Sequence, residues 1–225
     1  MTRRTRANLM LLVASAIWGS AFVAQRAGSD SMPPAAFTAV RHVIAALVLL
    51  PVIGWYDKSR QIPTDQRRLR WQLVLLPGAV IGAALFAGSY LQQFGLGYTT
   101  AGNAGFITSL YMVFVPLAGR LLGHPINRWV WVGVVLTTGG LYLLSVRDGF
   151  HMGLGDTLVL GGALAWTVQI LLIDKYAPSL DVLRLAFTEF LACAVIALVV
   201  ALATEADPFA GTMAAAAPLL YAGVL

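Results

Sequence analysis

Charged residues are scarce in this chain. Lys, Arg, Asp and Glu together make up 11% of its 225 residues, whereas soluble domains carry about 25%. Hydrophobic residues make up 59%, and the mean hydropathy is +0.78. A fold of this size could not hide so much apolar surface from water. The composition therefore excludes a soluble globular domain, and the same numbers exclude a disordered chain.

The chain has a single cysteine and lacks the common catalytic motifs. Cys193 has no second cysteine with which to form a disulfide, which excludes a disulfide scaffold. The sequence contains no phosphate-binding G-x-x-x-x-G-K-[ST] loop, no H-E-x-x-H zinc motif and no G-x-S-x-G nucleophile elbow. We therefore predict no cofactor and no metal site, and we do not expect an enzyme. An intramembrane enzyme or a lipid-handling protein is the weakest alternative.

The sequence does contain a series of long apolar runs. A membrane-spanning helix needs about 20 mostly apolar residues, and the runs predict an all-α polytopic membrane helix bundle. An eighth run begins at Met213 and reaches Leu225, and its 13 residues are too short to cross the bilayer core. From this we expect a C-terminally truncated reading frame. The seven predicted spans are 8–25, 35–54, 71–91, 101–122, 129–146, 154–173 and 182–203.

The basic residues are distributed unevenly between the predicted loops. With a cytoplasmic N-terminus, 12 of the 15 Lys and Arg lie on the cytoplasmic side, Arg26 and Arg147 lie outside, and Arg41 lies within a span. Such an excess is typical of cytoplasmic loops. We therefore predict a multi-pass protein of the cell inner (plasma) membrane with a cytoplasmic N-terminus. Topology explains the net charge of +5, and nucleic acid is not a predicted partner.

Two parts of the chain resemble one another. Residues 11–22 align with residues 159–170 at an offset of 148, which matches Trp18 with Trp166. An Ala-Phe-Thr triplet further along each part matches at an offset of 150. Five spans separate the starts of the two units, so the second unit would enter the membrane upside down. Inverted repeats around a site near the bilayer midplane recur in secondary transporters.

Four segments also carry a resemblance to a known family. Together they resemble the EamA-type permeases of the drug/metabolite transporter (DMT) superfamily. The resemblance implies two inverted five-helix repeats, the first at 8–146 and an incomplete second at 154–225. It further implies secondary transport of small organic solutes or metabolites across the inner membrane, often as export, by alternating access. The four segments are Ser15–Val23, Pro34–Arg41, Gly97–Tyr111 and Gly133–Ser145.

Six residues are predicted to line a cavity for the solute. Aromatic rings with nearby amides suit an amphipathic organic molecule, because they offer stacking area and a few orienting hydrogen bonds. A charge within a span is costly and usually faces a cavity or a partner. For the arginine, an anion-attracting or gating role and a structural role bonded to backbone carbonyls both stay open, and ordinary helix packing is the alternative for the others. The six residues are Trp18, Arg41, Asn103, Tyr111, Trp166 and Gln169.

Two further residues are candidates for proton coupling. Glu189 is the only glutamate within a predicted span, and the offset of 148 makes it the counterpart of Arg41. Intramembrane carboxylates and histidines form proton relays in many transporters. His42 is therefore the second candidate. The alternatives are a structural pair with Arg184 or a cytoplasmic water cavity for Glu189, and an ordinary hydrogen bond for the histidine. A direct pair between Arg41 and Glu189 also stays open.

The predicted partners are a small-molecule solute and the lipid bilayer, and a homodimer is left open. The alternative function is that of a truncated, non-transporting membrane fragment or subunit. This alternative is motivated by the apolar run that stops at Leu225.

Overall fold

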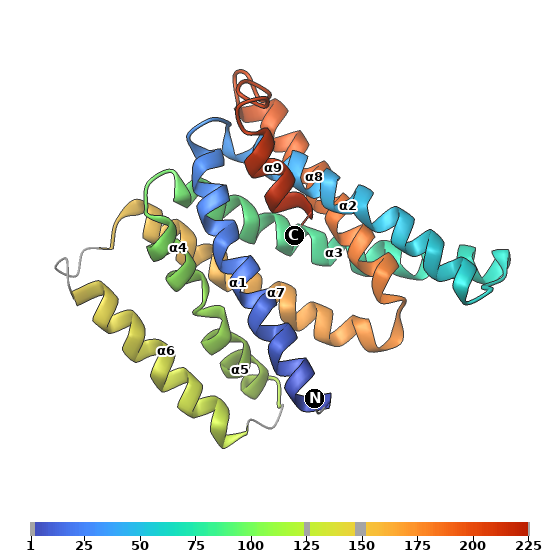
Figure 1. The fold of residues 1–225 in the computed structure, drawn as a ribbon, viewed down its shortest axis with the longest axis horizontal. Helices are drawn as coiled ribbons and strands as arrows, with labels where there is room; N and C mark the ends of the chain where they lie inside the picture. Colours follow the sequence, from blue (N-terminus) through green and yellow to red (C-terminus); the bar gives the residue numbers. More distant parts are fainter. Residues whose placement is uncertain (1–2, 124–126, 147–151, 225) are drawn as a thin grey trace.

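The computed structural model describes residues 3–123, 127–146 and 152–224 and arranges them as a bundle of helices (Figure 1). Within these ranges no β-strand occurs, which confirms the predicted all-α fold. Arg147, expected on the outer side, lies outside the described residues. The helices are α1 (Arg3–Ser29), α2 (Pro34–Ser59), α3 (Thr64–Leu96), α4 (Ala101–Thr108), α5 (Tyr111–Leu121), α6 (Arg128–Val146), α7 (Leu154–Tyr176), a 3₁₀ turn (Ala177–Ser179), α8 (Val182–Thr204) and α9 (Ala216–Val224).

Six helical segments in the described ranges are long and apolar enough to cross a membrane. They are α1, α2, α3, the α4–α5 segment, α7 with its 3₁₀ turn, and α8. The predicted span 129–146 forms α6, a 19-residue helix that is not among these six. Large apolar side chains cover the outside of the bundle, as Trp55 does with 70% of its surface exposed. These features confirm a polytopic membrane helix bundle.

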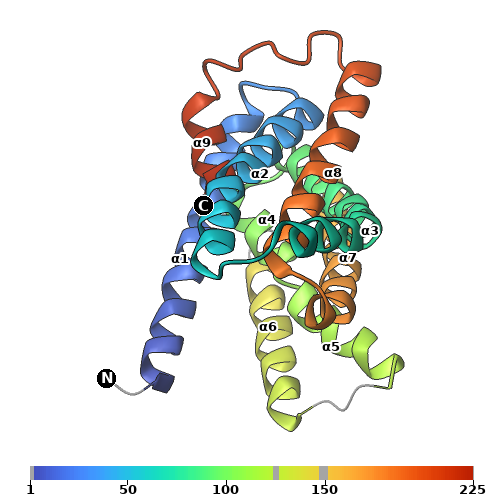
Figure 2. The same cartoon turned by 90° about the vertical axis from the view of Figure 1, so that its right-hand side faces the viewer.

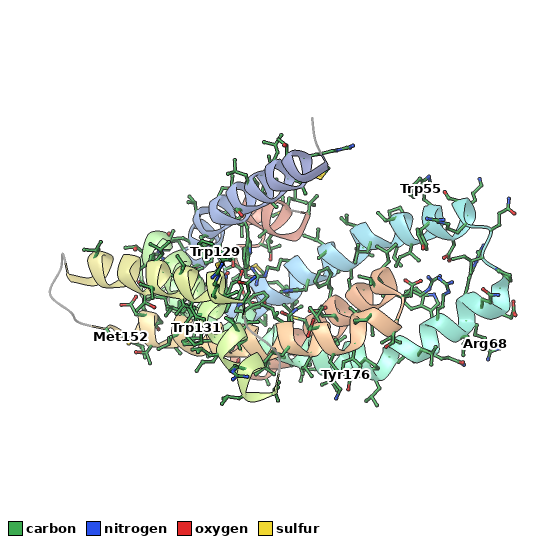
Figure 3. All side chains as sticks on the ribbon, turned by 90° about the horizontal axis from the view of Figure 1, so that it is seen from below. Trp55, Arg68, Trp129, Trp131, Met152 and Tyr176 are labelled. Carbon is green, nitrogen blue, oxygen red and sulfur yellow. The ribbon has the colours of Figure 1, made fainter. Side chains whose placement is uncertain are left out.

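The helix α3 begins earlier than the sequence predicted. The predicted spans 35–54 and 71–91 leave the residues between them, including 58–70, as a loop, but α2 continues to Ser59 and α3 starts at Thr64. Asp65 lies in the first turn of α3, where a carboxylate is favoured by the helix dipole. Lys58, Arg67, Arg68 and Arg70 therefore lie on helices, and Arg60 lies in the turn between α2 and α3. In Figure 3, Arg68 marks this end of the molecule, where α2 and α3 extend beyond the other helices.

The predicted span 101–122 consists of two helices. Helix α4 ends at Thr108 and α5 begins at Tyr111. At the junction, the backbone N–H groups of Met112 and Val113 bond to carbonyls three residues earlier, both at 2.9 Å. This tighter, 3₁₀-type bonding interrupts the regular α-helix. Interrupted helices at membrane depth are tolerated where protein or a cavity surrounds them.

Helix α3 packs closely against both α7 and α8. A Cβ atom added to Gly95 would lie 2.8 Å from the backbone oxygen of Gly155 on α7. A Cβ atom added to Gly82 would lie 2.6 Å from the backbone oxygen of Glu189 on α8. Only glycine allows this approach, and small residues at helix contacts are typical of membrane bundles. On the opposite side of the bundle, α9 lies beside α1 and α2 (Figure 2).

Helices α2 and α8 run antiparallel and are tied together at both ends. At the start of α2, the carboxylate of Glu205 accepts hydrogen bonds from the backbone N–H groups of Ala35, at 2.8 Å, and Ala36, at 3.0 Å. At the other end, Arg184 donates from Nη2 to both carboxylate oxygens of Asp57, at 2.7 Å and 2.6 Å. Arg184 is fully buried, so its charge depends on these partners.

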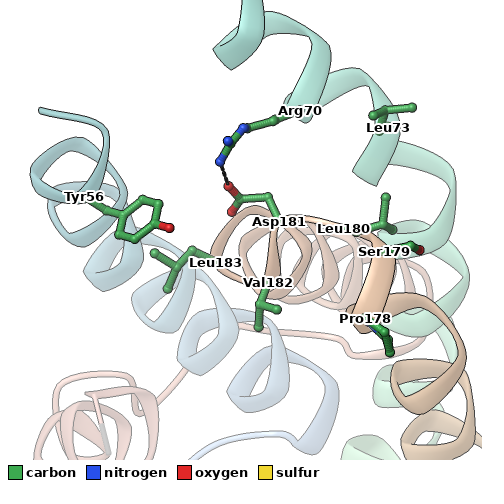
Figure 4. Close-up of a pocket in the computed structure, with 9 residues that line it drawn as sticks. All are labelled: Tyr56, Arg70, Leu73, Pro178, Ser179, Leu180, Asp181, Val182 and Leu183. Atoms are coloured by element: carbon green, nitrogen blue, oxygen red, sulfur yellow. Dashed lines mark hydrogen bonds and ion pairs between the residues drawn. The ribbon is translucent and has the colours of Figure 1, made fainter. Parts of the chain in front are cut away.

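A surface pocket of about 520 Å³ adjoins this second end (Figure 4). Its wall includes Asp181, whose carboxylate accepts a hydrogen bond from Arg70 on α3 at 3.0 Å. Arg184 donates to the same carboxylate oxygen at 2.8 Å. One carboxylate thus joins α3 to the start of α8. We call the group formed by Asp57, Arg70, Asp181 and Arg184 the ionic cluster.

Candidate functional site

A cavity of about 360 Å³ lies between α1, α2, α3, α7, α8 and α9. Its wall combines residues from the first part of the chain with residues that lie well over 100 positions later. Apolar side chains such as Leu85 and Phe190 form much of the surface. Five of the eight residues predicted to act in solute binding or proton coupling line this cavity: Trp18, Arg41, His42, Trp166 and Gln169.

Arg41 is buried in the cavity wall and is bound by amide groups. Its side chain is 6% exposed, and its Nη1 donates to Oε1 of Gln25 at 2.6 Å. The same oxygen accepts a hydrogen bond from Nε2 of Gln92 at 3.0 Å. Nε of Arg41 has no hydrogen-bond partner among the described residues. The structural alternative predicted backbone carbonyls as the partners of Arg41. The structure shows the side-chain amide of Gln25 instead.

Gln92 also lines the cavity, although it was not predicted from the sequence. Its Oε1 accepts a hydrogen bond from Thr108 on α4 at 3.2 Å. The neighbouring Gln93 donates to the backbone oxygen of Gln25 at 3.1 Å and to the hydroxyl of Ser29 at 2.7 Å. Together these bonds hold α1, α3 and α4 to the arginine on α2. Two adjacent glutamines in an apolar span are the signal that could have revealed them.

Glu189 pairs with neither Arg41 nor Arg184. Its Oε1 accepts a hydrogen bond from Nε2 of Gln169 at 2.5 Å. Arg184 instead belongs to the ionic cluster, so the structural pair considered for Glu189 is not formed. Glu189 is 4% exposed and is not part of the cavity wall, but its partner Gln169 is. His42 lines the cavity, and its Nδ1 lies 2.8 Å from the backbone oxygen of Thr38.

The predicted aromatic residues gather around Trp18. Its ring lies edge to face with that of Trp166, with centroids 6.5 Å apart, and 5.7 Å from the ring of Tyr111. Nε1 of Trp166 is buried without a hydrogen-bond partner among the described residues. Tyr111 contacts Trp18 but is not part of the cavity wall. Asn103 does not reach the cavity wall, and its backbone N–H donates to Oγ1 of Thr100 in the first turn of α4.

Residues that are 148 positions apart meet at the cavity. The two tryptophans form one such pair. The rings of His42 and Phe190 form another, with centroids 6.0 Å apart. Helices α2 and α8 also begin 148 positions apart, at Pro34 and Val182. Both ring contacts join residues at the offset of 148, not at the 150 that the Ala-Phe-Thr triplet indicated.

Helices α3 and α9 each pack closely against a neighbouring helix through a glycine. A Cβ atom on Gly82 of α3 would lie 2.6 Å from the backbone oxygen of Glu189. A Cβ atom on Gly223 of α9 would lie 2.9 Å from the backbone oxygen of Arg41. Each glycine lies five residues after a proline. The two helices therefore approach α8 and α2 at corresponding backbone positions.

The wall of the cavity carries groups that can bind a molecule noncovalently. It offers one guanidinium group, two indole rings and two amide side chains besides the amide that holds the arginine. In the part of the chain that the structure describes, no group of three or more His, Cys, Asp or Glu is placed to hold a metal ion. The volume and the mixed polar and apolar wall fit a small organic molecule.

Comparison with known families agrees with this geometry. The model of the EamA-like transporter family matches residues 5–146. The chain belongs to the EamA-like transporter family. This confirms the resemblance to EamA-type permeases of the DMT superfamily. Together with the six membrane-length helices, it identifies the chain as an integral, multi-pass membrane protein.

Several curated proteins are similar to this EamA-family chain. An uncharacterized transporter of Archaeoglobus fulgidus is 37% identical over 83% of the chain and 55% of its own length. The uncharacterized transporter YoaV of Bacillus subtilis is 23% identical over 96% of the chain and 74% of its own length. The uncharacterized inner membrane transporter YedA of Escherichia coli K12 is 25% identical over 67% of the chain.

The chain spans about half the length of two of these relatives, 55% of the archaeal protein and 47% of YedA. No solved structure gives a significant match.

Proposed function

We propose that this EamA-family chain takes part in secondary transport of small organic solutes or metabolites across the inner membrane, as an exporter that works by alternating access. The observation that carries the proposal is the 360 Å³ cavity, which is lined by both predicted units, 8–146 and 154–225. The transporter names of the relatives support it, and YedA is named an inner membrane protein.

The contacts between equivalent positions support an inverted-repeat mechanism. Two units related in this way can rock about a shared site and expose it first to one side and then to the other. We place the N-terminus in the cytoplasm, because of the basic residues on that side. The ionic cluster then lies at the cytoplasmic end of α2 and α8, and Glu205 lies at the outer end. Rocking of the first unit against the second would open these ends in turn.

Glu189 is our leading candidate for the proton carrier, with His42 as the second. Glu189 reaches the cavity through Gln169, whose amide donates to the carboxylate at 2.5 Å. A proton gained or lost at Glu189 would change this hydrogen bond and so move a cavity side chain. In a Glu189→Gln variant, export should no longer respond to a pH gradient. An unchanged response would remove Glu189 from the coupling mechanism.

Flux measurements in proteoliposomes test the transport function. Three labelled probes of different charge are offered to vesicles that contain the purified chain: N-acetylphenylalanine, choline and glucose. We expect at least one probe to cross faster than in protein-free vesicles. Trp166→Ala should lower this flux several-fold, because it removes part of the cavity wall. Trp55→Ala is the matched control, since Trp55 is 70% exposed and is not part of the cavity wall.

Absence of flux for all three probes would overturn the transport function of this chain. A dimer in detergent together with absence of flux would instead favour the alternative of a non-transporting membrane subunit.

A further inference from the structure

We infer that the cavity selects a small solute with a single carboxylate and an apolar body, and that Arg41 binds this carboxylate. The inference names the class of solute for the cavity and so rests on the proposed function. It depends on three features of the wall: an unpartnered cationic donor, the charge balance of the lining residues, and the aromatic surface beside the arginine.

The first feature is a donor of the Arg41 guanidinium that has no partner. Nη1 is occupied by Gln25 at 2.6 Å, while the buried Nε has no partner among the described residues. A carboxylate can bind a guanidinium through charge-assisted hydrogen bonds, often two in parallel. A buried donor without an acceptor raises the free energy of the empty site. A carboxylate would supply the missing acceptor.

The charge balance of the wall is the second feature. Among the described residues that line the cavity, Arg41 is the only Lys or Arg, and there is no Asp or Glu. The ion pairs found in the described ranges all involve other arginines. A buried charge is stabilised by an opposite charge. One positive charge matches one carboxylate, whereas a doubly charged phosphate monoester would need a second cation.

The third feature is the surface next to Arg41. Trp18 and Trp166 present their rings to the cavity, and Leu85 adds an aliphatic patch. The buried Nε1 of Trp166 has no partner in the described residues and lies beside Gly88 of α3. Apolar walls with a few convergent donors favour an apolar body that carries one polar end.

Glu189 is the group that could favour the opposite charge. Its carboxylate is not part of the cavity wall, and the amide of Gln169 occupies one of its oxygens. Gln169 therefore separates this negative charge from the solute. If Glu189 controlled selectivity, a cationic solute would bind best, and this outcome is included in the test.

Titration calorimetry on the purified chain in detergent tests the inference with three probes that share one body. N-acetylphenylalanine is an anion, N-acetylphenylalaninamide is neutral and phenylalaninamide is a cation. We expect the acid to bind at least about tenfold more tightly than the neutral amide, because a charge-assisted bond to a buried guanidinium is gained. Equal affinities, tightest binding of the cation, or no measurable binding of the acid would overturn the inference.

Variants assign the selectivity to one side chain. Arg41→Gln should abolish the preference for the acid, and Arg41→Lys should retain only part of it, because an ammonium group cannot form the two parallel bonds. Arg68→Gln is the matched control, since Arg68 is exposed at the start of α3. If Arg41→Gln kept the full preference for the acid, the assignment of the selectivity to Arg41 would be overturned. The comparison of acid and amide on the unaltered chain stands even if a variant does not fold.

The proteoliposome assay separates this inference from the proposed function. Selective binding of N-acetylphenylalanine without its transport would overturn the function and leave the inference standing. Transport of choline or glucose, with no preference for the acid in the binding assay, would support the function and overturn the inference.

Discussion

The indole rings of Trp18 and Trp166 meet edge to face with their centroids 6.5 Å apart, although the two residues are 148 positions apart in the chain. His42 and Phe190 are separated by the same number of positions and are also in ring contact, at 6.0 Å. Contacts at one repeated offset are what two inverted repeats facing each other would produce, and both pairs belong to residues that line the cavity.

Loss of the Arg184 charge should destabilise the chain strongly. Arg184→Gln would remove the two short hydrogen bonds to the buried carboxylate of Asp57 and leave it only the partly exposed Arg67, at 3.6 Å. Breaking a buried ion pair costs about 3–5 kcal/mol. The measurement is thermal unfolding of the purified chain in detergent. The double variant Asp57→Asn/Arg184→Gln should recover much of the loss, because no buried charge is then left unpaired. A loss no larger than that of Arg68→Gln would contradict the importance of the ionic cluster.

Gln25→Leu should also destabilise the fold, by about 1–3 kcal/mol. The substitution removes the acceptor shared by Arg41 and Gln92, so two buried donors lose their hydrogen bonds. Gln66→Leu is the control, because Gln66 is exposed on α3. Comparable unfolding temperatures for the two variants would show that the Gln25 hydrogen bonds are dispensable.

Gly82→Ala should destabilise the α3–α8 contact by about 1–3 kcal/mol, because the new methyl group would overpack it. Its Cβ would lie 2.6 Å from the backbone oxygen of Glu189. Gly223→Ala should act in the same way on the α9–α2 contact. Gly54→Ala serves as the control, since a Cβ there meets nothing within 4 Å. Unfolding temperatures that do not differ among the three variants would refute the close packing at the two glycines.

The contribution of Asp181 to stability should vanish in acid. Burial by itself raises the pKa of Asp181, but hydrogen bonds from Arg184 and Arg70 and the positive charge of Arg184 outweigh it, so the pKa lies below the ordinary value of 3.8. A carboxyl group whose pKa is lower in the folded state stabilises the fold above its unfolded pKa. This stabilisation is lost as the pH falls through the folded pKa.

The measurement for Asp181 compares the unfolding temperature of the unaltered chain with that of Asp181→Asn between about pH 7 and pH 3. The asparagine keeps an oxygen that can cap α8, so the comparison isolates the charge. We expect the difference to shrink at the acid end. A difference that stays constant over this range would refute the role of the charge.

Cysteine labelling tests the proposed orientation. In a Cys193→Ser background, which removes the one native and buried cysteine, single cysteines are introduced at Arg68 and Asp207. Both native residues are exposed. A membrane-impermeant maleimide applied to spheroplasts should label Asp207→Cys at once and Arg68→Cys only after permeabilisation. The reverse pattern would show that the N-terminus is outside.

Much of the helix layout can be predicted from sequence, and most of the side-chain pairing cannot. The predicted span 182–203 corresponds to α8 at Val182–Thr204, because an apolar run in a membrane must satisfy its backbone hydrogen bonds within itself. The prediction of a loop at 58–70 is wrong, because α2 and α3 continue past the ends of their apolar runs to Ser59 and back to Thr64. The interruption after Thr108 was also missed, since it arises from local 3₁₀ bonding that no glycine or proline at the junction marks.

The candidate site was also only partly predictable from the sequence. The burial of Arg41 and Glu189 could be predicted, because each lies within an apolar run. Their partners could not, since the amides of Gln25 and Gln169 reach them from other helices. The sequence left a direct pair between the two charges open, and the structure gives each a separate glutamine.

By itself the sequence determined that this chain is an all-α membrane bundle with a recognisable family pattern. Apolar run length and backbone hydrogen bonding are local properties, and they suffice for that conclusion. Only the tertiary structure decided that Arg184 joins Asp57 across 127 positions of the chain. It also decided that Arg41 retains an unpartnered Nε in the cavity wall. The physical reason is that long-range pairing depends on how the helices pack, which no short stretch of sequence encodes.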